Sequence, residues 1–118
     1  MKELLMVKEI VLMNIDAELS RAKQAVEEGN VGMARVCARR ACSISITYWL
    51  KDNLRPNYGE SAMNQLRGIQ SDDTLPKEIK DAAERLTTKV AEQTTSPFSD
   101  DPITDAKIIT NHFLIEKS

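Results

Sequence analysis

Small residues occupy one narrow stripe between residues 30 and 50, at Ala34, Ala38, Ala41 and Ser45. Successive residues of an α-helix turn by ~100°, so these four side chains lie above one another on a nearly flat face. Another helix can approach the backbone closely on such a face. The pattern therefore predicts the central helix of a helical bundle.

Start and stop signals predict a long helix before this one. It runs from about residue 2 to residue 28 and ends at Gly29, whose missing Cβ suits the left-handed conformation that follows many helices. Asn30 then caps the central helix, which we expect to continue to about Asn53. Pro56 breaks the chain after it.

Three further helices follow in the sequence. Asn57 and Glu60 have the spacing of a capping box for a short helix over about 58–70. The next helix ends near residue 93, with Asp73 or Thr74 as its cap, and Asp101 caps the last helix, which reaches about residue 115. We predict an all-α, up-and-down four-helix bundle with an additional short helix, forming one domain over residues 1–118.

The first helix carries two apolar stripes. One is expected to pack into the bundle, and it consists of Leu5, Leu12, Ile15, Leu19, Ala22 and Val26. The second lies ~160° around the helix and consists of Met6, Ile10, Met13 and Ala17. Leaving the second stripe in water would be costly, so we expect it to meet either the last helix (Ile103, Ala106, Ile109, Phe113) or another subunit.

Composition agrees with a helical fold in a reducing compartment. Aromatic residues make up only 4% of the chain, so aliphatic side chains must build the core. Cys37 and Cys42 lie ~140° apart on one helix and are expected to be buried, free thiols. The apolar N-terminus is interrupted by charges, so we expect no membrane span and a cytoplasmic location. We expect no metal site and no cofactor.

The central helix carries basic residues and almost no acidic ones. The net charge is only −2, yet no acid occurs between Glu28 and Asp52, where Arg35, Arg39 and Arg40 lie. Arg35 and Arg39 share a helix face and could grip a phosphate, while Arg40 points ~100° away from Arg39. Alternatively, these arginines pair with acids of neighbouring helices. Pairing of two copies of this helix would instead place them in a common basic cleft.

The order of these segments resembles the HEPN superfamily, small helical bundles named for higher eukaryotes and prokaryotes nucleotide binding. The resemblance covers nearly the whole chain and rests on the long first helix followed by Gly29-Asn30-Val31. It continues through four segments: MARVCARRACSISITYWLKD, MNQLRGI, LPKEIKDAAERL and SDDPITDAKIITNHFL. It implies a dimeric helical module that binds nucleotide or RNA, or that accompanies a nucleotidyltransferase or a toxin–antitoxin partner.

Many members of that family are ribonucleases in which an arginine and a histidine are separated by four to six residues. This chain lacks the pair, because its one histidine, His112, follows Lys107 with four residues between them, and lysine lacks the planar fork of arginine. Three hypotheses follow. The first is a non-catalytic module that binds nucleotide or RNA phosphate through Arg35, Arg39 and Arg40. The others are a divergent ribonuclease using Lys107 and His112, and a purely structural homo-oligomer.

Overall fold

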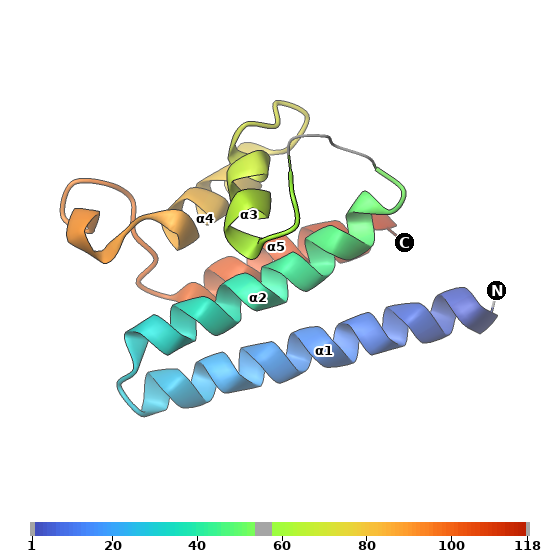
Figure 1. The fold of residues 1–118 in the computed structure, drawn as a ribbon, viewed down its shortest axis with the longest axis horizontal. Helices are drawn as coiled ribbons and strands as arrows, with labels where there is room; N and C mark the ends of the chain where they lie inside the picture. The colour runs from blue at the N-terminus through green and yellow to red at the C-terminus, as the bar shows by residue number, and fades with distance from the viewer. Residues whose placement is uncertain (1, 54–57, 118) are drawn as a thin grey trace.

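A computed structural model describes residues 2–53 and 58–117, and all regular structure within these ranges is helical. Side chains are described for residues 6–53, 58–89 and 91–114. The helices are α1 (Lys2–Glu27), α2 (Val31–Leu50), α3 (Ala62–Gln70), α4 (Lys77–Thr87) and α5 (Pro102–Lys117), with a short 3₁₀ turn, η1 (Val90–Glu92), after α4 (Figure 1). The predicted all-α fold class is confirmed for the described residues.

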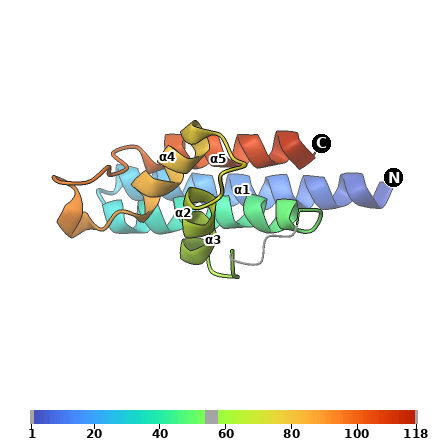
Figure 2. The same cartoon turned by 90° about the horizontal axis from the view of Figure 1, so that it is seen from above.

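Helix α2 lies at the centre of the bundle. Its stripe of Ala34, Ala38, Ala41 and Ser45 is fully buried. Helices α1, α3 and α5 all pack against it. The long helices α1, α2 and α5 are roughly aligned with one another, whereas the short α3 runs across them (Figure 2). The stripe of small side chains thus lies inside the helical assembly, as the sequence predicts.

Three predicted helix boundaries are confirmed by capping geometry. Gly29 has φ 76°, so it adopts the left-handed conformation after α1. The Asn30 side chain accepts a hydrogen bond from the Met33 amide (3.1 Å), and Asp101 accepts one from the Thr104 amide (3.0 Å). The far ends of these helices differ slightly from prediction, because α2 ends at Leu50 and α5 extends to Lys117.

Helix α3 begins four residues later than the sequence indicates. Gly59 adopts φ 72°, which a right-handed helix cannot include, and Ser61 accepts a hydrogen bond from the Asn64 amide (3.1 Å) as the cap. The predicted capping box with Glu60 is therefore wrong, and its other member, Asn57, lies outside the described residues. Tyr58 instead enters the core and donates its hydroxyl to Asp72 (2.8 Å).

Helix α4 is shorter than predicted at both ends. Asp72 accepts a hydrogen bond from the Thr74 amide (3.0 Å) in a turn, so neither predicted cap begins the helix, and Pro76 occupies the cap position without a side-chain bond. The helix ends at Thr87, because Thr88 is extended (φ −67°, ψ 132°). The predicted continuation to about residue 93 is replaced by an irregular segment with η1.

The core joins aliphatic residues to a small aromatic cluster. The Trp49 ring lies 4.7 Å from Phe113 and 6.0 Å from Tyr58, measured between centroids. Cys37 and Cys42 are free and buried, as predicted, and burial raises the pKa of the Cys42 thiol. Both cysteines therefore act as small apolar side chains rather than as reactive groups.

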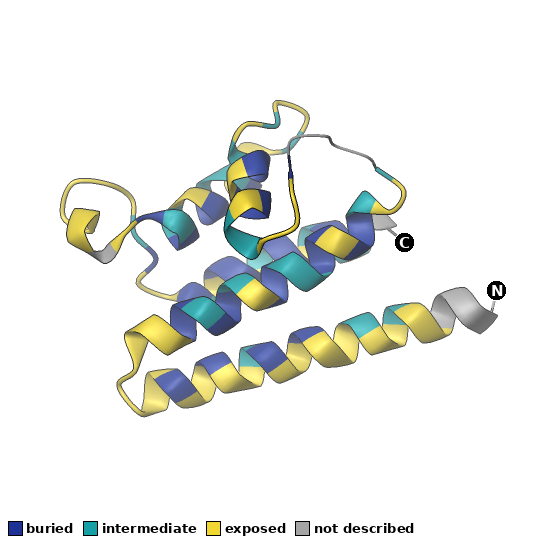
Figure 3. Cartoon of the chain, in the orientation of Figure 1, coloured by how far each residue is buried: buried dark blue, intermediate teal, exposed yellow. Residues whose placement is uncertain are grey.

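Helix α1 buries only one face, and this face differs in part from the predicted one. Ile15 and Ala22 are buried as expected, but Leu12 and Val26 are exposed, and Ala25 is buried in their place. Figure 3 shows the outer side of α1 as almost continuously exposed. Because α1 packs mainly against α2 and only slightly against α5, its buried face follows α2.

The second stripe of α1 remains uncovered in this chain. Met6, Ile10, Met13 and Ala17 are all exposed. Of the two coverings that the sequence allows, the last helix does not provide one, because Ala106, Ile109 and Phe113 are buried in the core of the bundle instead. A second subunit remains as the alternative that the sequence offered.

None of the described helices has the length and apolar character needed to cross a lipid bilayer.

An ion pair between α4 and α5 gives a test of this packing. Arg85 donates from Nη2 to Asp105 Oδ1 (2.7 Å), and the Asp105 carboxylate is buried. Arg85→Met would leave that carboxylate unpaired and should lower the free energy of unfolding by about 3 kcal/mol in urea titrations. The control is Lys77→Met, which removes an exposed pair with Asp81 on the same helix and should leave the urea midpoint unchanged. Equal effects of the two variants would contradict this account.

Candidate functional site: a basic cleft between α2 and α4

A cleft of about 530 Å³ lies between the beginning of α2 and the end of α4, with Met63 of α3 at its side. Three of its lining residues are charged, and all three are basic: Arg35, Arg39 and Lys89. The remaining lining residues are neutral, namely Asn30, Gly32, Met33, Val36, Met63, Thr87 and Thr88. Its charge therefore favours an anionic ligand.

Arg35 anchors the wall of this cleft. Its Nη2 donates to the carbonyl oxygens of Thr88 (2.6 Å) and Leu86 (3.0 Å), at the end of α4. The last carbonyl oxygens of a helix have no amide partner within the helix, and the helix dipole is negative at this end. Both features favour a cation here. The guanidinium carbon also lies 4.2 Å from the centre of the Phe98 ring.

The environment of Arg35 indicates a structural role. Arg35 is only 4% exposed. Burial lowers the pKa of its guanidinium, and the neighbouring positive charge of Arg39 lowers this pKa as well. The buried Nη1 has no acceptor among the described residues. Because Nη1 is shielded from solvent, a ligand could reach it only after neighbouring side chains move.

Arg39 reaches the same helix end from one turn further along α2. Its Nη1 donates to the Leu86 carbonyl (3.1 Å), and its side chain is half-buried. Burial lowers the pKa of Arg39 as well. A guanidinium has five N–H donors, so this bond leaves others that can face the cleft.

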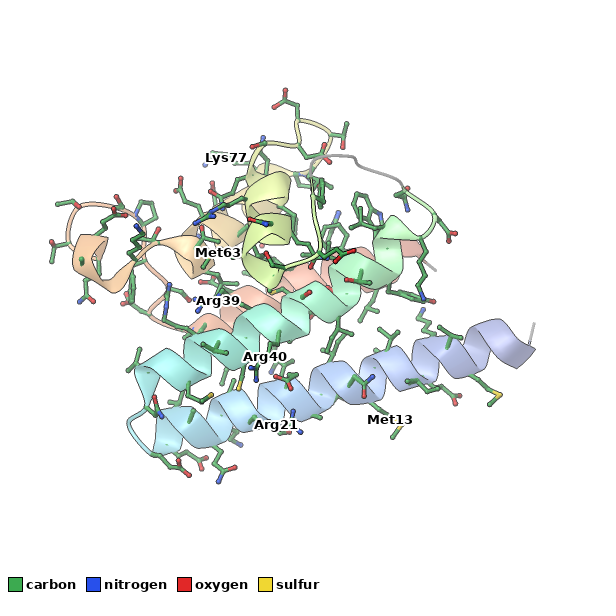
Figure 4. All side chains as sticks on the ribbon, in the orientation of Figure 1. Met13, Arg21, Arg39, Arg40, Met63 and Lys77 are labelled. Carbon is green, nitrogen blue, oxygen red and sulfur yellow. The ribbon has the colours of Figure 1, made fainter. Side chains whose placement is uncertain are left out.

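Arg40 does not belong to the cleft. Figure 4 shows Arg39 on the side of α2 that faces α3 and α4, whereas Arg40 lies on the side toward α1. Arg40 is exposed and is absent from the cleft lining. The three arginines predicted to bind phosphate together are thus divided between two faces of one helix.

Lys89 is the cleft residue that sequence reasoning missed. It is exposed and lies two residues after the end of α4. The sequence placed this lysine inside a helix that continues to about residue 93. The early end of α4 instead places it at the cleft, near the arginines of α2.

The beginning of α2 adds positive potential to the same cleft. Asn30, Gly32 and Met33 line it, and the first amides of a helix have no intrahelical acceptor. The helix dipole is positive at this end, and the residues after the cap contain no acid. The cleft therefore combines the positive end of α2 with three cationic side chains, two of which also neutralise the carbonyl end of α4. The positive helix end and the cations favour a phosphate group.

Lys107 and His112 are not brought together as an acid–base pair. Both lie on α5, where five residues correspond to ~140° of rotation. Lys107 is exposed, while the half-buried His112 ring packs edge-on against Phe113 (5.1 Å between centroids). Neither residue lines the basic cleft.

The described part of the chain contains no cluster of three or more His, Cys, Asp or Glu residues placed to hold an ion.

Comparison with known proteins gives no relative: no protein-family model, curated protein or solved structure matches this chain.

The structural role of Arg35 can be tested by unfolding. Arg35→Met removes two charge-assisted hydrogen bonds to buried carbonyls, so we expect the free energy of unfolding to fall by roughly 2–4 kcal/mol. Arg40→Met removes an exposed cation from the same helix and should leave the urea midpoint nearly unchanged. If both variants unfold at the wild-type urea concentration, Arg35 does not hold α4 in place.

Proposed function

We propose that this chain is a non-catalytic binding module that holds the phosphate of a nucleotide or of RNA in the basic cleft. One observation supports this most directly: the charged residues lining the cleft are three cations and no acid. The net charge of the chain is −2, so a cleft whose charged residues are all basic does not simply reflect the charge of the whole chain.

The three cations have different tasks in this proposal. Arg35 fixes the end of α4 and thereby the shape of the cleft, because its Nη2 is already occupied by two carbonyls. Lys89 is exposed and supplies a mobile point charge to the phosphate. Arg39 contributes donors that its single bond to Leu86 leaves available.

We also propose an HEPN-like relationship, with a homodimer as the working form. The order of the helices, the central α2 and the uncovered face of α1 support this. A nucleotidyltransferase or toxin–antitoxin partner rests on the family resemblance alone. The absence of an arginine before His112 at the family's spacing favours binding over cleavage.

Ribonuclease activity through Lys107 and His112 is the less favoured alternative. Their side chains leave α5 in different directions, so one chain does not present them to the same phosphate. A cleavage site would need further groups from a second copy or from a partner.

Binding can be tested with two variants that each remove one exposed lysine or arginine charge. Lys89→Ala should weaken binding of fluorescently labelled ATP and of a short single-stranded RNA about five- to tenfold at low salt, measured by anisotropy. Arg40→Ala changes the net charge equally but lies outside the cleft, so it should bind like the wild type. For RNA, the slope of log K against log salt should also fall by ~0.7 in Lys89→Ala.

Two results would contradict the proposal. Equal weakening by both variants would place the ligand elsewhere on the surface. If neither ATP nor RNA binds the wild-type chain at low salt, the purely structural oligomer becomes the better hypothesis.

A further inference from the structure

The uncovered face of α1 has the spacing of a coiled-coil seam. Met6, Ile10 and Met13 are 59%, 53% and 69% exposed, and Ala17 is exposed as well. Their spacings of four, three and four residues match alternating d and a positions of a heptad repeat. Helix α1 forms the lower edge of the molecule in Figure 1, and Met13 points away from α2 in Figure 4.

We propose that this face packs against the same face of a second copy of this chain, with the two α1 helices parallel and in register. Each residue of the seam then meets its own counterpart, Met6 against Met6 and Ile10 against Ile10. This inference rests on the homodimer proposed above and adds its interface and orientation. It does not depend on what binds in the basic cleft.

The charges beside the seam decide between the two orientations. With the seam residues at d and a, Glu9 and Asp16 occupy g positions, and Arg21 occupies an e position. In a parallel pair, residue g of one helix faces the following e of the other, so Asp16 faces Arg21 of the second copy. A two-fold symmetric dimer makes this contact twice.

An antiparallel pair would bring like charges together. Aligning the same four apolar residues in that orientation places Met6 against Ala17 and Ile10 against Met13, so that the g positions face each other. Glu9 would then lie beside Asp16 of the second copy, again twice. Opposite charges favour, and like charges disfavour, an interface at these flanking positions.

The side chains needed for the parallel contact are accessible. Asp16 is exposed, and the Arg21 side chain is 62% exposed while it donates from Nη1 to Glu18 of its own helix. The other donors of the guanidinium can therefore reach a second carboxylate. Arg21 would join Glu18 to Asp16 of the second copy without any change in the fold.

The seam is confined to the first two-thirds of α1. The next d and a positions are Ser20 and Gln24, so the apolar contact stops after Ala17. The basic cleft lies at the α1–α2 turn and the end of α4, beyond that point. A parallel dimer thus leaves the cleft of each copy open to its ligand.

Disulfide trapping can distinguish the orientations. Cys37 and Cys42 are buried, so an introduced thiol at the surface of α1 is the one available for cross-linking. Under mild oxidation, Met13→Cys should form a covalent dimer, because its counterpart lies opposite it in the parallel pair. Val26→Cys is the matched control, since Val26 is an exposed apolar residue of α1 outside the seam, and it should stay monomeric on a non-reducing gel.

Mixing two variants sharpens this test. A mixture of Ile10→Cys and Met13→Cys chains should give Ile10→Cys and Met13→Cys homodimers by mass spectrometry. Cross-links only between an Ile10→Cys chain and a Met13→Cys chain would show the antiparallel arrangement. That result would overturn the proposed orientation, while the chain would still form a dimer with itself.

A charge reversal provides an independent measurement. In sedimentation experiments over a range of concentrations, Asp16→Arg should weaken the wild-type dimer at least tenfold, because the introduced arginine meets Arg21 of the second copy. Combining it with Arg21→Glu should restore the dimer. If Asp16→Arg strengthens the dimer, the introduced arginine faces Glu9 and the helices are antiparallel. If the wild-type chain stays monomeric at every concentration, both the proposed homodimer and its orientation are wrong. Binding of ATP and RNA in the basic cleft does not depend on this result.

Discussion

The close packing of α2 is the constraint from which the rest of the structure follows. A helix that a neighbour approaches closely needs small residues on the approached face, and Ala34, Ala38, Ala41 and Ser45 provide such a face with no exposed surface. The same central position means that polar residues on α2 need partners within the protein. Arg35 is buried because its own helix is surrounded, and it can be buried because α4 ends beside it with free carbonyl oxygens.

The end of α4 links this packing to the cleft. Thr87 turns its hydroxyl back to the carbonyl of Ala83 (3.1 Å), and the next residue leaves the helical conformation. The Leu86 carbonyl oxygen, near the end of the helix, accepts hydrogen bonds from both Arg35 and Arg39. Since the chain then continues as irregular structure, Lys89 lies at the cleft rather than on a helix face. One helix terminus thus explains both why the arginines are held and why a third cation joins them.

The sequence predicts the parts of this structure that depend on local patterns. Gly29, Asn30 and Asp101 mark helix ends through conformational preference and capping, and all three do so in the structure. The predictions fail where tertiary contacts decide. The sequence predicts that a helix begins at Tyr58, but Tyr58 is buried in the core. Gly59 has a positive φ, so α3 begins only after it.

The candidate site shows the same limit. Helical spacing correctly separates Arg40 from Arg39 and places Arg35 and Arg39 on one face, but it cannot show that this face meets the end of α4. A cluster assembled from two distant segments has no signal in a single sequence, and Lys89 was therefore missed.

The two proposed surfaces make different physical demands on the chain. A phosphate site needs a few fixed cations near a helix terminus, and the bonds of Arg35 and Arg39 to α4 supply that rigidity within one chain. An exposed apolar face is instead incomplete in a single copy, because Met6, Ile10 and Met13 each keep more than half of their surface in water until another surface covers them. The bundle therefore does not need a dimer to form its cleft.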